Sequence, residues 1–223
     1  MGTVIYLASV APLADGALAA RLMRRLLPER REKTARLRDA GARRLSLGVG
    51  LLLSRALADA GHGASPLCVS AQGKPCFPAL PDFHFSLSHS GEMAMCAASD
   101  RPLGCDLERG QRYDPRIAAR FFHPDEAAWL RALPEERQPD GFLRLWTLKE
   151  SYMKATGLGF ALPMDGFAVS AGEPPLLTRA ADTRPWRLRA FREGAYFCAL
   201  CAEDADGPCP VVRVDFEKLG ESE

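Results

Sequence analysis

An acid and a base lie one helical turn apart in the segment 146–154. Glu150 and Lys154 are four positions apart in a stretch that is otherwise largely apolar. In a helix, residues i and i+4 lie on one face, so both side chains would point the same way as Trp146. The ordinary interpretation is a surface ion pair worth roughly 0.3 kcal/mol. A second charged cluster favours a functional site.

The second cluster is the pair of carboxylates Asp106 and Glu108. Their segment, 103–108, follows an apolar stretch at 93–98 and a turn at 99–102. We therefore expect 103–108 to be the second strand of a hairpin with 93–98. Because alternate strand residues point to the same side, Asp106 and Glu108 would project together.

Two adjacent carboxylates repel each other unless a cation lies between them. Hard oxygen ligands of this kind suit Mg²⁺, which usually takes one or two carboxylates and completes its shell with water and substrate phosphates. Glu150 is available as a third carboxylate and Lys154 as a phosphate contact. The alternative is a solvated strand edge with two unrelated acids.

Composition is that of an ordinary globular protein. The chain has 223 residues, 47% of them hydrophobic and 26% charged, and a formal net charge of +1. That length is enough for one sizeable domain or two small ones, and the total charge implies no polyanionic partner. The basic residues are unevenly placed, because the segment 21–44 holds nine arginines and Lys33. Such a local block indicates an anion-binding site.

The seven cysteines indicate a reducing compartment in which most of them are buried thiols. Cys198 and Cys201 have the CxxC spacing, but no second such pair or histidine pair accompanies them. In a strand their sulfurs would face opposite sides, so a metal site is not expected there. The segment 1–20 lacks a basic leader and contains Pro12 and Asp15, which favours a cytoplasmic protein. No stretch reaches the roughly 20 apolar residues of a membrane helix.

Two parts of the chain have a similar pattern. The segments 85–100 and 188–204 each read as strand, tight turn and strand, and each follows a long helical pattern, at 42–60 and 142–156. We therefore expect an α+β fold with a pseudo-twofold repeat of two similar halves, each a small antiparallel sheet packed with a long helix. The halves would be 1–101 and 102–223.

Further polar residues of the first half fit phosphate binding. Lys74 lies in a Gly-Lys-Pro turn, and Ser88 and His89 lie near a strand end. Taken singly, such a lysine is usually solvated, and such a histidine usually bonds to a backbone carbonyl. A serine hydrolase is disfavoured because no Gly-x-Ser-x-Gly elbow is present.

Four ordered motifs give the chain a family resemblance. They are Gly73-Lys74-Pro75, Ser88-His89-Ser90, Gly104-x-Asp106-x-Glu108 and Trp146-Thr147-x-Lys149-Glu150-x-x-x-Lys154. In order and spacing they resemble the signature motifs of the Sfp-type 4'-phosphopantetheinyl transferases, over about 26–169. Cys105 stands where an aliphatic residue is more usual, and Ser151 where alanine is common.

The resemblance implies an activity. Such enzymes are pseudo-dimeric α+β monomers that bind coenzyme A and Mg²⁺ and transfer phosphopantetheine to a serine of an acyl or peptidyl carrier protein. The released product is adenosine 3',5'-bisphosphate. A cytoplasmic transferase without nucleic-acid or membrane partners is therefore expected. Fatty-acid, polyketide, peptide-synthetase and aminoadipate-reductase carriers all remain open, and a role in secondary metabolite biosynthesis is among the expectations.

The resemblance also implies roles for individual residues. Asp106, Glu108 and Glu150 would hold Mg²⁺, and Lys154 would contact the phosphate under attack. Glu150, or a water that it orients, is the candidate base for the serine hydroxyl. The remaining candidates would bind coenzyme A: Lys74, Pro75, Ser88 and His89 its phosphates and adenylate, and Arg30, Lys33 and Arg44 its 3'-phosphate.

The same residues bear on two other functions and on a docking surface. A Mg²⁺-dependent nuclease would need an extended basic surface, which the second half lacks. A non-catalytic coenzyme A-binding protein would have lost an acid, whereas all three are present. The segment 111–122 is the candidate docking surface for the carrier, with Arg112 and Arg116 exposed. The alternative is that its apolar residues Ile117, Phe121 and Phe122 belong to the core of a short helix.

Overall fold

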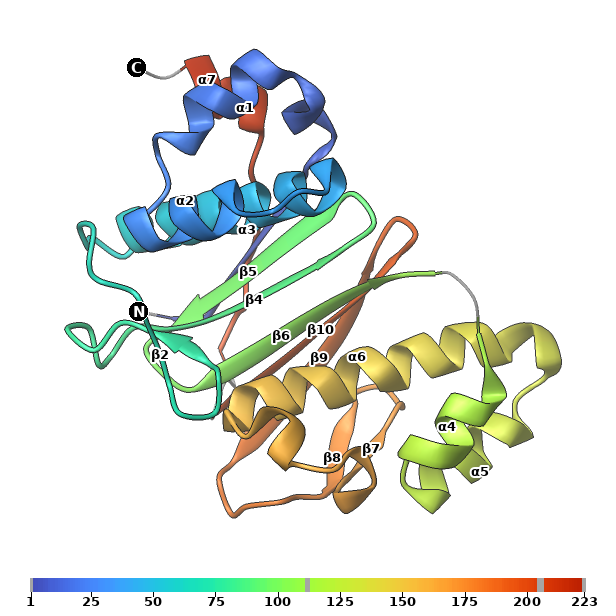
Figure 1. The fold of residues 1–223 in the computed structure, drawn as a ribbon. Helices are drawn as coiled ribbons and strands as arrows, with labels where there is room; N and C mark the ends of the chain where they lie inside the picture. Colours follow the sequence, from blue (N-terminus) through green and yellow to red (C-terminus); the bar gives the residue numbers. More distant parts are fainter. Residues whose placement is uncertain (1, 111–112, 204–206, 222–223) are drawn as a thin grey trace. The chain divides into compact units, whose positions relative to one another are not determined.

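The computed structural model describes residues 2–110, 113–203 and 207–221, and Figure 1 shows its elements. The chain divides into two compact units. Unit 1 comprises Met1–Ser70, Pro75–Arg101 and Gly207–Glu223, and unit 2 comprises Ala71–Lys74 and Pro102–Asp206. Each unit has its own hydrophobic core.

Unit 1 is a four-stranded sheet covered by helices. The strand order is β11-β1-β5-β4, in which β1 pairs antiparallel with β5 and parallel with β11. The strands are β1 (Val4–Ser9), β4 (His84–Ser90), β5 (Met93–Ser99) and β11 (Val211–Arg213), with a separate two-stranded sheet of β2 (Cys68–Val69) and β3 (Pro75–Cys76). The helices are α1 (Gly16–Met23), α2 (Pro28–Ala35), α3 (Ala40–Asp59) and α7 (Phe216–Glu221), with the 3-10 turn η1 (Ala11–Ala14).

A side-chain cap and a glycine mark the two ends of the long helix of unit 1. The Asp39 side chain accepts a 2.6 Å hydrogen bond from the Ala42 amide and so caps the N-terminus of α3. Gly61, with φ +76°, follows the C-terminus in the left-handed region. Between them, Leu51, Leu52 and Leu53 are fully buried in the core that α3 shares with the sheet.

Unit 2 is a three-stranded antiparallel sheet packed with one long helix. The strand order is β6-β10-β9. The strands are β6 (Leu103–Arg109), β9 (Trp186–Glu193) and β10 (Tyr196–Glu203), with a second sheet of β7 (Ala168–Ser170) and β8 (Leu176–Arg179). The helices are α4 (Pro115–Phe121), α5 (Pro124–Ala132) and α6 (Gln138–Thr156), with the 3-10 turns η2 (Glu135–Arg137), η3 (Gly159–Ala161) and η4 (Met164–Gly166).

The expected hairpins at 85–100 and 188–204 are present as β4–β5 and β9–β10. Their turns contain Gly91 and Gly194, both with φ +57°, a conformation that glycine adopts without steric cost. The expected hairpin between 93–98 and 103–108 is wrong. Strand β5 is already paired on both edges, with β1 and β4, so β6 pairs with β10 instead.

The mixed α+β class is confirmed, whereas the pseudo-twofold repeat stays a prediction. The compact units differ from a simple division into 1–101 and 102–223 in two segments. The segment 207–223 belongs to unit 1 because β11 pairs with β1, and Ala71–Lys74 belongs to unit 2. Among the described residues, no helix is both long and apolar enough to cross a membrane.

Four of the cysteines are buried thiols. Cys96, Cys105, Cys198 and Cys201 are each at most 1% exposed, and none of the seven cysteines, all of which are described, forms a disulfide. Burial, followed by nearby negative charge, raises the pKa of Cys198 to about 12, and burial also raises the pKa of Cys201 well above its ordinary value. Burial thus disfavours the thiolate form of Cys198 and Cys201.

Candidate active site

The catalytic candidates of unit 2 meet because α6 packs closely on β6. A Cβ atom on Gly104 would lie 2.7 Å from the carbonyl carbon of Lys154, and closer still to the Ser151 oxygen and the Ala155 nitrogen. No side chain fits between the strand and the helix backbone there. Gly104, Asp106 and Glu108 alternate along one face of β6, so the face that touches α6 also carries the two acids.

Lys154 and Asp106 form an ion pair in this interface. The Lys154 Nζ lies 2.6 Å from Asp106 Oδ1, and the Asp106 side chain is only 5% exposed. Burial by itself would lower the pKa of Lys154, but the negative charges of Asp106, Cys105 and Glu150 and the hydrogen bond to Asp106 outweigh it, so the pKa is raised. Lys154 therefore stays a cation beside the carboxylates. The surface ion pair between Glu150 and Lys154, expected as the ordinary alternative, is replaced by a part-buried one across two elements.

Glu150 lies close enough to both strand acids to sense their charge. Its pKa is raised from 4.5, first by burial and then by the negative charges of Asp106 and Glu108, while Lys154 opposes the shift. The side chain is half-buried on the same helix face as Lys154. The structure thus brings together three carboxylates and one ammonium group.

The side chains of this cluster are of the types that bind a hard divalent cation. Three carboxylates offer the oxygen ligands that Mg²⁺ prefers, and a bound cation would relieve the repulsion that adds to burial in raising the pKa of Glu150. Over 2–110, 113–203 and 207–221, however, no three acidic, histidine or cysteine side chains stand in an arrangement ready to hold a metal ion. The Lys154 ammonium group bonds to Asp106 Oδ1 instead.

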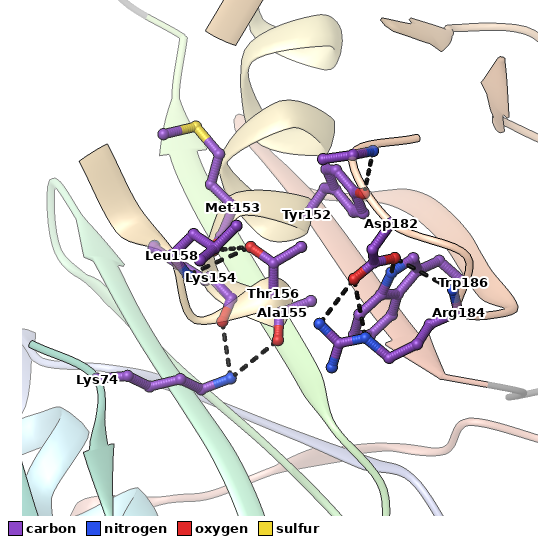
Figure 2. Close-up of polar contacts among 11 residues, drawn as sticks. Lys74, Tyr152, Met153, Lys154, Ala155, Thr156, Leu158, Asp182, Arg184 and Trp186 are labelled. Atoms are coloured by element: carbon purple, nitrogen blue, oxygen red, sulfur yellow. Dashed lines mark hydrogen bonds and ion pairs between the residues drawn. The ribbon is translucent and has the colours of Figure 1, made fainter. Parts of the chain in front are cut away.

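Lys74 lies at the C-terminus of α6 (Figure 2). Its Nζ donates to the carbonyl oxygens of Lys154 at 2.7 Å, Ala155 at 3.3 Å and Leu103 at 2.9 Å. A cation is favourable at this end of a helix, where carbonyl groups lack partners. Gly157, with φ +75°, ends the helix at this point. Lys74 thus has a structural role beside α6, and its expected contact with coenzyme A stays a prediction.

The sequence did not predict the buried ion pair between Lys149 and Glu126. The Lys149 Nζ donates to Glu126 at 2.8 Å and to the Phe167 carbonyl oxygen at 3.0 Å, and it lies 4.0 Å from the centroid of the Phe167 ring. Glu126 also accepts from the Val169 and His123 amides. The pair joins α5, α6 and the start of β7. The signal in the sequence was a lysine beside the apolar positions of α6, at Leu145, Leu148 and Tyr152.

The segment proposed for docking has both exposed and buried apolar residues. Phe121 is 44% and Ile117 36% exposed, whereas Phe122 is 3% exposed and stacks on Phe142 at 5.3 Å. Arg116 is exposed as expected, and it pairs with Asp114 at 2.8 Å. Gln111 and Arg112 lie outside the described residues. The core interpretation therefore holds for Phe122 only.

The residues predicted to bind the 3'-phosphate belong to two adjacent helices of unit 1. Arg30 of α2 is 8% exposed and donates to the Ser46 carbonyl oxygen of α3 at 3.1 Å. Burial lowers its pKa, and its Nε is buried without a hydrogen-bond partner among the described residues. Lys33 is exposed, and Arg44 borders a cavity of about 520 Å³ between α1 and α3.

Ser88 and His89 have different environments in unit 1. They are neighbours in β4, so their side chains point to opposite faces of the strand. Ser88 is 8% exposed and His89 is exposed. Pro75 is half-buried in β3. Their roles in ligand binding stay predictions.

Comparison with known proteins identifies the family. The model of the 4'-phosphopantetheinyl transferase superfamily matches residues 102–201, which include β6, α6 and all four charged residues of the site. The 4'-phosphopantetheinyl transferase Sfp of Bacillus subtilis strain 168 is 35% identical over 205 residues, which cover 89% of this chain and 92% of the relative. The chain belongs to the 4'-phosphopantetheinyl transferase superfamily.

Other family members are similarly close. A second 4'-phosphopantetheinyl transferase of Bacillus subtilis is 39% identical over 206 residues, with the same coverage of both chains. The transferase HetI of Nostoc sp. strain PCC 7120 is 38% identical over 149 residues, 62% of each chain. The predicted family and the prediction of a transferase enzyme are confirmed, whereas the residue roles are not tested by these matches.

Proposed function

We propose that the protein transfers the 4'-phosphopantetheine moiety of coenzyme A to a serine of an apo acyl or peptidyl carrier protein, with Mg²⁺ as cofactor. The observation that carries the proposal is the cluster of Asp106, Glu108, Glu150 and Lys154 on one interface of unit 2. The serine oxygen would form a bond to the phosphorus next to pantetheine. The bond from that phosphorus to the second phosphate would break, and adenosine 3',5'-bisphosphate would leave.

Asp106, Glu108 and Glu150 are the residues that would hold the metal. When bound there, Mg²⁺ would neutralise charge on the pyrophosphate oxygens. Such transfers depend chiefly on positioning and on charge stabilisation, because the protein itself has little covalent chemistry to perform. The close packing at Gly104 supports the proposal, because it holds the acids of β6 against α6.

Glu150 and Lys154 are the proposed catalytic residues. Glu150 is half-buried beside the two strand acids, and it is the carboxylate that we assign to accept the serine proton, directly or through a water. The pKa of Lys154 is raised, so it remains charged and can stabilise negative charge on the phosphate under attack.

Coenzyme A would also contact residues of unit 1 and of the segment that contains Lys74. We assign Lys74, Pro75, Ser88 and His89 to its phosphates and adenylate. Arg30, Lys33 and Arg44 are assigned to the 3'-phosphate. Lys33 is exposed and Arg44 borders a cavity, which supports the second assignment because an anionic ligand can reach both cations.

The finer features of the fold belong to the same proposal. In each unit a strand, a long helix and a hairpin follow one another, which supports a pseudo-twofold repeat with halves 1–101 and 102–223. A monomer located in the cytoplasm, without nucleic-acid or membrane partners, is the expected working form. The identity of the carrier and a role in secondary metabolite biosynthesis stay predictions.

The decisive experiment is to incubate the protein with coenzyme A, Mg²⁺ and an apo carrier protein and to measure the mass of the carrier. We expect a mass increase of one phosphopantetheine on the carrier serine and stoichiometric adenosine 3',5'-bisphosphate. An unmodified carrier despite measurable coenzyme A binding would indicate a non-catalytic binding protein. Release of nucleotides from added nucleic acid would indicate the nuclease.

A further inference from the structure

Two exposed cysteines face each other in the small sheet of unit 1. Strands β2 and β3 pair antiparallel with Cys68 opposite Cys76 and Val69 opposite Pro75. Both cysteines are exposed free thiols. Directly opposed residues of an antiparallel pair have Cα atoms about 4.5–5.5 Å apart and side chains on the same face. That separation lies within the range of disulfide-bonded cysteines.

The chain on either side of the two cysteines is anchored. Phe77 is 2% exposed in the core of unit 1, and Leu67 packs against the same core. The Leu67 amide also donates to Glu29 at 3.3 Å. These contacts keep the two strands opposite each other at the cysteine positions.

On the other side of the cysteine pair, the two-stranded sheet has no buried side chain to stabilise it. Each strand has two residues, and Val69 is 67% exposed. A two-stranded pair without a buried face is marginally stable in water. A covalent bond between the strands would therefore change the stability of this segment more than that of a strand in the core.

The other cysteines differ from this pair. Cys96, Cys105, Cys198 and Cys201 are buried, and Cys209 is half-buried. Thiol oxidation follows exposure, so an oxidant in solution would reach Cys68 and Cys76 first. Cys105 of β6, which stands where the family more often has an aliphatic residue, should therefore be oxidised little because it is buried.

We propose that Cys68 and Cys76 are a redox modification site, a dithiol that closes to an intramolecular disulfide by exchange with a low-molecular-weight disulfide such as glutathione disulfide. One thiolate attacks the oxidant, forms a mixed disulfide and releases one glutathione thiol. The second thiolate then attacks the protein sulfur of the mixed disulfide, and a second glutathione thiol leaves. Both protein thiol protons pass to solvent or to the departing glutathione thiolates. The protein dithiol is thereby oxidised to a disulfide, and one glutathione disulfide is reduced to two glutathione thiols.

The closed ring would contain the segment that carries Lys74. Residues 70–74 connect the two strands, and Lys74 donates to the last carbonyl groups of α6 (Figure 2). Closing the ring restricts the segment to conformations compatible with the β2–β3 pairing. The effect on ligand binding rests on the proposed function, in which Lys74 contacts coenzyme A. Pre-organisation of the segment should then tighten coenzyme A binding by about threefold.

The experiment uses the full chain at low protein concentration in a buffer of glutathione disulfide, with peptide mass spectrometry under non-reducing conditions. We expect a disulfide between Cys68 and Cys76 in the wild type, reversed by a thiol reductant. Cys68→Ser should instead carry one glutathione on Cys76. The matched control Cys209→Ser should form the same disulfide as the wild type. Amide exchange over 69–74 should slow in the oxidised wild type and stay unchanged in Cys68→Ser.

Glutathione on both cysteines without an internal disulfide, or disulfides only between two chains, would overturn the proposal. If the disulfide forms and amide exchange in the segment between β2 and β3 does not change, the disulfide does not restrict that segment. Calorimetry with coenzyme A tests the link to ligand binding. If the disulfide forms but neither form binds coenzyme A, the proposed function fails while the redox site stands.

Discussion

Strands β1 and β6 make a similar pairing with a hairpin of their own sheet, yet they carry different residues. Each pairs antiparallel with the second strand of a hairpin, and the hairpin turns contain Gly91 and Gly194, both with φ +57°. When the two sheets are aligned on these glycines, Tyr6 of β1 corresponds to Asp106 of β6. The two registers thus place residues of different chemistry at corresponding positions.

In unit 1 the position is part of a conventional core. Tyr6 is 1% exposed, and its hydroxyl donates to Asp59 at the end of α3 at 3.1 Å. In unit 2 the corresponding Asp106 is 3% exposed and accepts from Lys154 near the end of α6. A buried carboxylate costs more desolvation than a buried tyrosine. At this position unit 2 therefore has a part-buried ion pair with Lys154 of α6 in place of the aromatic packing found in unit 1.

The long helix of unit 2 likewise buries more charge than the long helix of unit 1. The buried residues of α3 are apolar residues, glycines and Ser46, whereas α6 buries the charged Lys149. The close approach also differs. In unit 1 a Cβ on Gly48 of the helix would meet the Val10 side chain at 2.5 Å, whereas Gly104 of β6 faces the helix backbone itself. Side chains can shift, but the backbone of a packed helix does so only at a larger cost.

The largest expected effect concerns the buried pair of unit 2. Lys149→Met leaves the buried Glu126 without its cation and should destabilise the protein by about 3–5 kcal/mol, measured by urea unfolding. The control Leu53→Met, at a fully buried position of α3, should cost less than about 1.5 kcal/mol. Similar losses in the two variants would remove this difference between the helices.

The second prediction concerns the corresponding strand positions. Asp106→Asn keeps the shape of the side chain but removes its charge, and it should lower the turnover number at least about 100-fold. Tyr6→Phe in unit 1 should retain nearly full activity, because it loses only the contact with Asp59. Carrier modification assays and near-ultraviolet circular dichroism would check both variants. Normal turnover by Asp106→Asn in saturating Mg²⁺ would refute the assignment of this carboxylate.

The third prediction concerns the ligand-binding role proposed for unit 1. Arg44→Ala should lose most of the preference for coenzyme A over dephospho-coenzyme A, a preference of roughly 10- to 100-fold if the contact is charge-assisted. Arg43→Ala is the matched control, because the Arg43 guanidinium donates to the Leu37 carbonyl oxygen at 2.7 Å. Calorimetric titration with both ligands measures the ratio. Equal discrimination by wild type and Arg44→Ala would place the 3'-phosphate elsewhere.

The fourth prediction concerns the contact between β6 and α6. Gly104→Ala places a methyl group against the backbone of Ser151 and Ala155, so it should destabilise the protein by about 1–3 kcal/mol and reduce turnover. The corresponding residue of β1 is Val4, which already carries a side chain. Val4→Ala should leave turnover unchanged. A Gly104→Ala variant with the stability and turnover of the wild type would show that the helix backbone moves aside readily.

The smallest expected effect is a difference in pH dependence. The pKa of Glu150 is raised from 4.5, chiefly by burial, so the folded protein binds more protons than the unfolded chain between the two pKa values. Its contribution to stability is therefore present at low pH and lost as the pH rises from about 4.5 through the raised pKa. Glu150→Gln should flatten this loss, seen as melting temperature against pH. Mg²⁺ at neutral pH should raise the melting temperature of the wild type more than that of the variant.

Asp15 of unit 1 provides a control of opposite sign. Hydrogen bonds from the Leu18 and Ala17 amides lower the pKa of this helix cap below 3.8. Its contribution is present above that value and lost as the pH falls. Asp15→Asn should therefore change only the acidic limb of the profile. A variant Glu150→Gln that also changed only the acidic limb would contradict the raised pKa.

Local periodicity in the sequence was enough to predict which residues share a face. Alternation along 104–108 predicted that Asp106 and Glu108 project together, and the helical repeat predicted the same for Glu150 and Lys154. The two hairpins and their glycine turns were equally local, and each is present. The ordered motifs identified the family for the same reason, since residue type and spacing are properties of the chain alone.

Only the tertiary structure decided which faces meet. Lys154 pairs with Asp106, 48 positions away, and Lys149 pairs with Glu126, 23 positions away. Periodicity specifies the direction of a side chain from its own element but contains no information on what lies opposite. Strand β6 likewise pairs with β10 and not with the preceding strand, because both edges of β5 are already paired in unit 1. The partners in a packed interior follow from the pairing and burial of the whole chain, and a local pattern cannot specify them.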